Sequence, residues 1–380
     1  MVDVPTQRLR RVGAAALLLA VLAGCSGPAQ APTTRRSDAT PIASVDPRIV
    51  GAEIDERIQA HFDNSPDAFK NVRAVLVTVD GRPVLERYFG SSAEDTSDTL
   101  SVTKSLMSIL IGIALDEGLI DSVDQTLAEL LPTHAADMAA TSRAVTLRQV
   151  LTMTGGFPPQ SSDVGPDAWF RADDPTRKIL SDGPVQVSEP DFSYSNAGSH
   201  LLSVIVAEAT GRSTLDYARE KLFTPLGIDT EPAVEPVVTG DVIPGYDEAA
   251  FAWPRDAQGY HFGDCCIKLS ARDMAKLGQL MLDDGRWQGT QIVSAEWVRT
   301  STRPHVRAGG AAEHYGYQWW VTEADGHPAY AAVGRYGQLV EVVPPLDLVV
   351  VVSSVAAPGN AGDSMVSMVS YVVAPAFRSQ

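Results

Sequence analysis

The residues whose types and spacing could do chemistry begin with Ser101 and Lys104, in the tetrapeptide Ser101-Val102-Thr103-Lys104. On a helix, side chains at this spacing lie on one face and can exchange a proton. A serine with such a lysine can become a nucleophile without a histidine. Because S-x-x-K also arises by chance, the assignment depends on what else accompanies it in the chain.

Two further motifs follow in the chain: Tyr194-Ser195-Asn196 and, later, Gly334-Arg335-Tyr336-Gly337-Gln338. A tyrosine can serve with the lysine as general base, since a nearby cation favours the phenolate. An asparagine side chain can hydrogen-bond the lysine or a substrate amide. These residue types are therefore compatible with acyl transfer by an activated serine.

A Ser-His-Asp enzyme is the competing chemistry. The chain has no G-x-S-x-G elbow, and His200, His261 and His305 stand in no recognisable context. These histidines are expected to be scattered surface residues or internally paired ones.

Hydrophobic periodicity indicates the elements that must position these motifs. The stretch Leu106–Leu115 is apolar on nearly every side, which predicts a central, buried helix that begins near Ser101 and ends at Gly118. Further helices are expected at Leu147–Met153, Leu201–Ala209, Asp216–Leu222, Ala271–Leu282 and Ser364–Phe377. Strands are expected at Val72–Val79, Pro83–Phe89, Tyr317–Thr322, Ala329–Val333, Leu339–Val343 and Leu348–Ser353.

Strands at both ends with helices between them predict an α+β fold, in which the two ends of the domain build one antiparallel sheet flanked by helices. The expected hydrolase domain spans residues 46–380. Its α/β part covers about 46–120 and 264–380, and a helical subdomain covers about 121–263.

The N-terminal segment is typical of a bacterial lipoprotein. Arginines precede the apolar stretch Val12–Ala23, which is too short to span a bilayer stably and reads as a signal peptide over residues 1–24. The stretch ends at Leu22-Ala23-Gly24-Cys25, which resembles a lipobox, so Cys25 is the expected lipid anchor. Residues 25–45, rich in Pro, Ala, Ser and Thr, are expected to form a disordered tether. We therefore expect a lipid-anchored protein at the extracytoplasmic face of the cell membrane.

The formal net charge of −17 argues against binding to nucleic acid or to anionic lipid headgroups. No phosphate-cradling glycine loop and no Cys/His spacing for zinc is present, so no cofactor and no metal are expected. Apart from Cys25, the only cysteines are Cys265 and Cys266. A bridge between neighbours would be strained, which favours two small core residues over a disulfide, although the bridged form stays open.

Together these motifs resemble those of the penicillin-recognising serine hydrolases: serine β-lactamases, penicillin-binding proteins and their esterase and amidase relatives. The Y-x-N motif is similar to the class C β-lactamase and DD-peptidase branch. Context motifs of the same kind include Leu269-Ser270-Ala271-Arg272-Asp273 and Tyr315-Gly316-Tyr317-Gln318-Trp319-Trp320, which most resemble 6-aminohexanoate-dimer hydrolases and esterases. The resemblance covers about Val72–Ser354 and implies a β-lactamase/transpeptidase-like fold.

The resemblance also implies roles. Ser101, Lys104 and Tyr194 would be catalytic, with Ser101 forming an acyl-enzyme and the other two moving its proton. The expected substrate-binding residues are Asn196, Arg335, Gly337 and Gln338. The backbone N–H groups of Ser101 and Gln338 would stabilise the oxyanion, and the missing side chain of Gly337 would let substrate lie against a strand.

The third motif departs from the family pattern, because Arg335-Tyr336-Gly337 stands where many members have Lys-Thr-Gly. An arginine could clamp a substrate carboxylate, which favours an esterase or amidase over an efficient β-lactamase. A DD-carboxypeptidase or β-lactamase and a non-catalytic ligand-binding lipoprotein remain alternatives. Trp319 and Trp320 are either a substrate platform or core residues. The expected partner is a small-molecule or peptide substrate; the oligomeric state is left open.

Overall fold

The computed structural model describes residues 47–159, 169–185, 191–238, 243–309, 312–355 and 362–377. These residues belong to one compact unit, Ile42–Gln380. The expected signal peptide at 1–24, the tether at 25–45 and Cys25 lie outside the described residues. Within the described ranges, no helix is both long enough and apolar enough to cross a bilayer.

The centre of the fold is an eight-stranded sheet in the order β2-β1-β14-β13-β12-β11-β10-β9. Every pairing in it is antiparallel. Its strands are β1 (Val72–Val79), β2 (Arg82–Tyr88), β9 (Val306–Arg307), β10 (His314–Tyr315), β11 (Trp320–Ala324), β12 (His327–Gly334), β13 (Gln338–Val343) and β14 (Leu348–Ser354). Because β1 lies between β2 and β14, segments from both ends of the unit build one sheet, which confirms the α+β prediction.

The other strands form short pairs, and a 3₁₀ turn connects two strands of the large sheet. β3 (Thr96–Asp98) pairs antiparallel with β6 (Lys268–Ser270), and this small pair joins the nucleophile motif to the segment before α11. The other pairs are β4 (Ala233–Val234) with β5 (Phe251–Ala252), and β7 (Arg286–Trp287) with β8 (Thr290–Gln291). The 3₁₀ turn η5 (Arg335–Gly337) connects β12 to β13.

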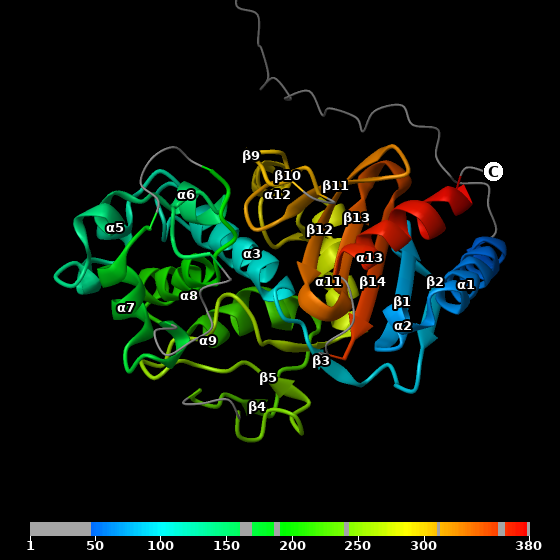
Figure 1. Cartoon of the computed structure of the whole chain (residues 1–380), viewed down its shortest axis with the longest axis horizontal. Coiled ribbons are helices and arrows are strands. Elements are labelled where there is room, and N and C mark those ends of the chain that lie inside the picture. The colour runs from blue at the N-terminus through cyan, green and yellow to red at the C-terminus, as the bar shows by residue number, and fades with distance from the viewer. Residues whose placement is uncertain are drawn as a thin grey trace, which may run out of the picture. The chain divides into compact units, whose positions relative to one another are not determined.

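One face of the sheet is covered by helices from the two ends of the described chain (Figure 1). They are α1 (Pro47–Asn64), the short α2 (Pro66–Phe69) and α13 (Gly362–Met368), continued by η7 (Val369–Val373) and η8 (Ala374–Phe377). α1 buries Val50, Ile54 and Ile58 at intervals of four, so a single apolar stripe holds it against the sheet. This helix was not expected from the sequence.

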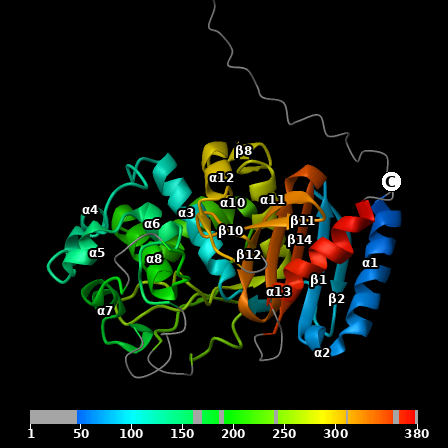
Figure 2. The ribbon, with the colours of Figure 1, turned by 45° about the horizontal axis from the view of Figure 1, so that its top comes forward.

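The opposite face packs against α11 (Ala271–Leu282) and α3 (Val102–Asp116). Both views place α3 between the sheet and the helical segments of the middle of the chain (Figures 1 and 2). Every residue of α3 from Val102 to Ala114 is buried, which confirms the central helix. Gly112 allows the closest approach, because a β-carbon there would lie 2.2 Å from the Trp297 ring.

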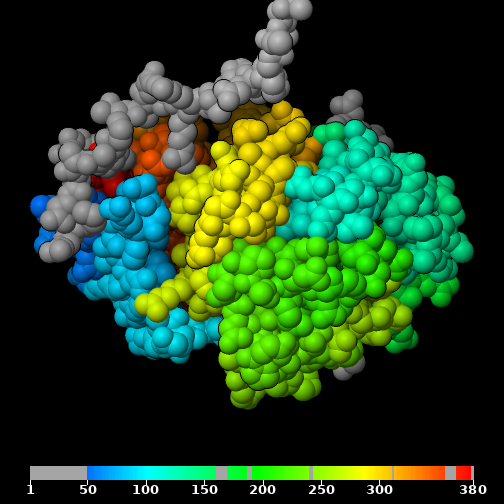
Figure 3. All heavy atoms as spheres, turned by 180° about the vertical axis from the view of Figure 1, so that it is seen from behind, coloured from blue at the N-terminus to red at the C-terminus, as the bar shows by residue number. Residues whose placement is uncertain are grey.

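The middle of the chain is built mainly of short helices. They are α4 (Leu127–Leu130), η1 (Pro132–His134), α5 (Ala140–Ala144), α6 (Leu147–Leu151), η3 (Trp169–Arg171), α7 (Pro175–Asp182), α8 (Asn196–Thr210), α9 (Thr214–Ala218), η4 (Arg219–Phe223) and α10 (Thr224–Leu226). The helix α12 spans Ala295–Ser301. Seen from behind, the region of α11 and α12 lies between the β1–β2 segment and these helices (Figure 3).

The structure overturns one sequence-based preference. Cys265 and Cys266 form a disulfide instead of remaining two separate core thiols. Both residues are only partly buried, and Cys266 has a φ of +78°, a backbone conformation that a cysteine seldom adopts. The local backbone thus brings neighbouring sulfur atoms together, a feature that the sequence pattern does not encode.

Candidate active site

Ser101 lies at the junction of β3 and α3. Leu100 has a φ of +50°, and its N–H donates to Asp98 Oδ1 at 2.8 Å. This sharp turn redirects the chain from the strand into the helix, so that Ser101 occupies the N-cap position and remains partly exposed. Its side chain makes no capping bond, which leaves the hydroxyl available for other contacts.

Lys104 is held by neutral acceptors in the interior. The residue is 1% exposed, and its Nζ donates to Ser101 Oγ at 3.0 Å, to Asn196 Oδ1 at 2.7 Å and to the Asp264 carbonyl at 2.7 Å. No carboxylate of the described residues forms an ion pair with it. All three hydrogen-bond acceptors of this amine are therefore uncharged groups.

Asn196 and Tyr194 flank the start of α8. Ser195 caps this helix, since its Oγ accepts the N–H of Gly198 at 3.1 Å, and the cap fixes Asn196 as the first helical residue. The ring of Tyr194 lies over Lys104, with Nζ 5.0 Å from the ring centroid. The first two motifs are therefore brought together around one buried amine.

An aromatic cluster supports Tyr194. Its ring stacks on Trp320 with centroids 5.6 Å apart, and Phe192 and Tyr315 contact the same pair. Trp319 instead is 1% exposed and belongs to the core. Trp320 contacts Tyr194 and also packs against the core on the α1 side of the sheet, so a platform role for it stays a prediction.

The residues of the third motif have different surroundings. Arg335 is exposed, whereas Gly337 is buried with a φ of +95°. A β-carbon at Gly337 would lie 2.9 Å from Ser354 Oγ and 3.2 Å from Met365, so its missing side chain makes room for the protein interior and not for a substrate. The side chain of Gln338 is also internal, since it donates to the Ser354 carbonyl and accepts the Ser354 N–H.

Gly334 is the glycine of this segment that reaches the nucleophile junction. A β-carbon there would lie 2.5 Å from the carbonyl oxygen of Thr99, which accepts the N–H of Val102 at the start of α3. In addition, β11 pairs with β12 only as far as Trp320 opposite Ala331, so the last residues of β12 have no partner on β11. The spacing of two glycines in the motif was the available signal, but it could not say which glycine lies against Thr99.

Sequence reasoning also missed Asp264. Its carbonyl is one of the three acceptors of Lys104, and its carboxyl is buried with Oδ1 lacking a hydrogen-bond partner among the described residues. Burial raises the pKa of this carboxyl, while the charges of Lys104 and His200 act in the opposite direction. No sequence motif pointed to this residue, because its contact with Lys104 depends on backbone conformation.

The histidines provide no partner for Ser101. His200 is buried with Nε2 3.2 Å from Asp256 Oδ2, and His261 is buried with Nε2 3.0 Å from Glu235 Oε2. His305 Nε2 lies 2.8 Å from the carbonyl of Thr300. These residues are internally paired, as one of the two readings expected, and the described chain contains no Ser-His-Asp arrangement.

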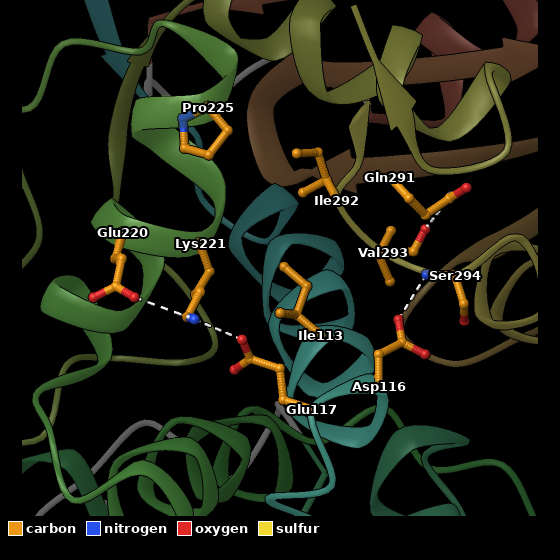
Figure 4. Close-up of a pocket in the computed structure, with 10 residues that line it drawn as sticks. All are labelled: Ile113, Asp116, Glu117, Glu220, Lys221, Pro225, Gln291, Ile292, Val293 and Ser294. Carbon is orange, nitrogen blue, oxygen red and sulfur yellow. Dashed lines mark hydrogen bonds and ion pairs between the residues drawn. The ribbon is translucent and has the colours of Figure 1, made fainter. Parts of the chain in front are cut away.

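A pocket lies at the other end of α3 (Figure 4). It has a volume of about 520 Å³ and is lined by Ile113, Asp116, Glu117, Glu220, Lys221, Pro225, Gln291, Ile292, Val293 and Ser294. Its charges are already paired, since Lys221 lies between Glu117 and Glu220. None of the predicted site residues lines this pocket.

The described residues contain no group of three or more His, Cys, Asp or Glu side chains placed to hold a metal ion.

An antiparallel sheet, a buried central helix and an S-x-x-K pair with a facing Y-x-N motif define a hydrolase of the β-lactamase and penicillin-binding-protein type. The chain belongs to the beta-lactamase family, whose model matches residues 68–367.

Several relatives agree with this placement. The chain is 25% identical to the 6-aminohexanoate-dimer hydrolase of Paenarthrobacter ureafaciens, over 84% of this chain and 81% of that protein. It is 28% identical to penicillin-binding protein 4 of Amycolatopsis lactamdurans, over 73% of this chain and 79% of that protein. Among solved structures, EstCE1, described as a hydrolase with promiscuous acyltransferase activity, superposes with a TM-score of 0.66 at 17% identity, covering 87% of this chain and 99% of that one.

Proposed function

We propose that this protein is a serine hydrolase that cleaves an ester or amide through an acyl-enzyme on Ser101. The observation that carries the proposal is the fully buried Lys104, whose Nζ lies 3.0 Å from Ser101 Oγ and whose other acceptors are neutral. This arrangement can take the hydroxyl proton as the oxygen attacks a carbonyl carbon.

In the proposed mechanism, Lys104 and Tyr194 form the general base for acylation. Lys104 accepts the proton of Ser101, and the Tyr194 ring above Nζ favours the resulting ammonium through a cation–π contact. The proton then goes to the leaving group, and a water molecule attacks the acyl-enzyme by the reverse sequence of proton transfers. Asn196 keeps the amine in position throughout, through its bond to Nζ.

Backbone donors stabilise the oxyanion in this proposal. The first is the N–H of Ser101, at the N-terminus of α3, where the helix dipole favours negative charge. The second, implied by the family resemblance, is the N–H of Gln338. That residue pairs with Gly334, which lies against Thr99 next to the nucleophile junction.

The proposed substrate is an ester or amide whose polar end meets Arg335. This arginine is exposed in the turn after β12, and a guanidinium there can bind a carboxylate with two hydrogen bonds. The similarity to a 6-aminohexanoate-dimer hydrolase supports amide chemistry. Gly337 and the side chain of Gln338 are internal, and we assign neither a direct contact with substrate.

Penicillin-binding protein 4 among the relatives favours a second candidate, a DD-carboxypeptidase or β-lactamase that acts on cell-wall peptides or β-lactams. A fluorescent penicillin distinguishes the candidates. Stable labelling that disappears in Ser101→Ala favours a penicillin-binding function, whereas rapid ester turnover without labelling favours the esterase or amidase.

We also propose that the protein is a lipoprotein at the extracytoplasmic face of the membrane, attached through Cys25. The support is the sequence Leu22-Ala23-Gly24-Cys25 after an apolar segment. Fractionation of cells that express the wild type or Cys25→Ser tests it. Membrane association that is lost in the variant supports the anchor, and unchanged membrane association contradicts it.

The catalytic proposal is tested by hydrolysis of p-nitrophenyl butyrate by the wild type and by Ser101→Ala. We expect turnover in the wild type and its loss in the variant. Equal turnover in both proteins would remove Ser101 from the mechanism. Binding of ligands with no covalent gain in mass and no turnover of esters, amides or β-lactams would instead indicate the non-catalytic binding protein.

A further inference from the structure

The segment that carries the Cys265–Cys266 disulfide also holds the nucleophile motif in place, and this inference rests on the function proposed above. On one side of the disulfide, the carbonyl of Asp264 accepts Lys104 Nζ at 2.7 Å. On the other side, the carbonyl of Ile267 accepts both the N–H and the Oγ1 of Thr99, each at 2.9 Å. In the sequence, the two cysteines therefore lie between the residue that binds Lys104 and the residue that binds Thr99, which precedes Ser101 by two positions.

A third contact starts from the disulfide itself. The carbonyl of Cys266 accepts the Tyr246 hydroxyl at 2.9 Å, and Tyr246 also contacts the carboxyl of Asp98. Asp98 in turn accepts the N–H of Leu100, the residue before Ser101. The backbone from Asp264 to Ile267 thus supports the turn into α3 as well as the lysine.

The backbone at Cys266 is one that its side chain disfavours. Its φ of +78° lies in the left-handed region, which glycine adopts readily and residues with a β-carbon do not. A disulfide between neighbours closes a small ring that includes their shared peptide bond, so it restrains the backbone on both sides of that bond. Without this ring, relaxation of Cys266 toward negative φ would move the carbonyls that bind Lys104 and Tyr246.

We propose that the Cys265–Cys266 disulfide is a redox-dependent positioning element of the active site, which holds Lys104 in place when oxidised and releases it when reduced. The reductant is a dithiol. Its two thiols transfer two electrons and two protons, the Cys265–Cys266 S–S bond breaks, two S–H bonds form, and the reductant becomes a disulfide. Both cysteines are partly exposed, so such a reagent can reach them.

The expected consequence is a loss of kcat with little change in KM, because the displaced group acts in the proton transfer and not in substrate binding. Small displacements of a catalytic group cost up to about 100-fold in rate, so we expect kcat for p-nitrophenyl butyrate to fall by about 10-fold or more after reduction.

The experiment compares the full-length protein before and after treatment with dithiothreitol. Its redox state is read from the tryptic peptide Asp256–Lys268, which contains both cysteines and lies between Arg255 and the cleavage site at Lys268. The peptide gains two alkyl groups from iodoacetamide only when it is reduced. Free thiols in the untreated protein would overturn the proposal, as would an unchanged kcat in a protein whose peptide is fully alkylated.

Two matched variants separate a positioning effect from loss of folding. Cys265→Ser with Cys266→Ser lacks the bridge but keeps a β-carbon at the left-handed position, so it should show the low kcat of the reduced wild type. Cys265→Ser with Cys266→Gly also lacks the bridge, but glycine tolerates the φ of +78°. It should recover most of the oxidised rate and be insensitive to dithiothreitol. Equal activity of the two variants would overturn the proposal.

Failure of this inference is distinguishable from failure of the proposed function. If Ser101→Ala is as active as the wild type, the catalytic assignment is wrong whatever the redox state. If Ser101 is required but reduction changes neither kcat nor KM, only the positioning role of the disulfide is lost.

Discussion

One lysine lies at each end of α3, and the two lysines differ in the charge of their hydrogen-bond partners. At the N-terminal end, Lys104 donates to a hydroxyl, an amide and a carbonyl, and no carboxylate in the described part of the chain forms an ion pair with it. At the C-terminal end, Lys221 lies 2.5 Å from Glu117 and 3.1 Å from Glu220, and its hydrogen bonds with Glu117 and then Glu220 raise its pKa.

The difference shows which feature matters for the chemistry. The C-terminal end has a pocket of about 520 Å³ with several charges, but its carboxylates keep the lysine an ammonium ion. The N-terminal end has a buried amine whose three hydrogen-bond acceptors are all uncharged. A pocket with several charges therefore does not by itself mark the catalytic end of the helix, whereas the acceptors of each lysine distinguish the two ends.

The largest expected effect comes from removing the buried amine. Lys104→Met should lower kcat for p-nitrophenyl butyrate by about 1,000-fold while KM changes little, because a general base contributes about 100- to 10,000-fold. The matched control is Lys221→Met, which should change kcat by less than about 2-fold, because Lys221 lines the pocket at the other end of α3 and its partly exposed ion pairs contribute only about 0–1 kcal/mol to stability. Similar losses in the two variants, or a change in KM alone for Lys104→Met, would contradict the comparison.

A second substitution gives Lys104 a carboxylate partner, as Lys221 has at the other end of α3. Asn196→Asp places a carboxylate against Lys104 Nζ, at the position where Asn196 Oδ1 now accepts at 2.7 Å. The anion should hold the lysine as ammonium, so kcat/KM at neutral pH should fall by about 100-fold and the acidic limb of the pH–rate profile should move up by about 1–3 units. Steady-state rates between pH 5 and 10 measure both. An unshifted profile would show that Lys104 does not titrate in the mechanism.

The third prediction extends the comparison to a buried acid. Glu341 is fully buried with Thr322 as its hydrogen-bond donor at 2.7 Å, and burial raises its pKa from 4.5 to about 8. Because the folded state retains this proton longer than the unfolded state, stability should be greatest below pH 4.5 and should fall as pH rises to about 8. The loss should be on the order of a few kcal/mol.

Glu341→Gln tests this directly, since glutamine mimics the protonated acid. Urea unfolding at pH 5 and pH 8 should show a smaller decrease in the variant, which should be the more stable protein at pH 8. A variant that keeps the full pH dependence of the wild type would place the titrating group elsewhere.

Local patterns predicted much of the fold. The strand Val72–Val79 and the helix Ala271–Leu282 agree with β1 and α11 to the residue, because alternation and amphipathic spacing are strong there. α1 was missed because only one narrow stripe of it is apolar, next to a Pro- and Ala-rich segment. The Ser101–Lys104 spacing is local, so the sequence could predict this pair, whereas the contact of Asn196 with Lys104 was implied only by the family resemblance.

What remained hidden depends on contacts between distant segments. Gly334 faces Thr99 and Gly337 faces Met365. The local sequence does not distinguish the two glycines, because the atoms that exclude a side chain at each position come from distant segments. The role of Asp264 comes from a carbonyl, and every residue has one. The Cys265–Cys266 bridge depends on backbone angles that composition does not reveal.

The account's central claim is that Ser101 carries the acyl group, and the most direct measurement is the site of acylation. The protein is mixed with p-nitrophenyl butyrate, quenched in acid during the first turnovers and digested. We expect one butyryl group on the tryptic peptide 88–104, assigned by fragmentation to Ser101 and absent from Ser101→Ala. Turnover with no acylated peptide, or with the butyryl group on another residue, would contradict the account.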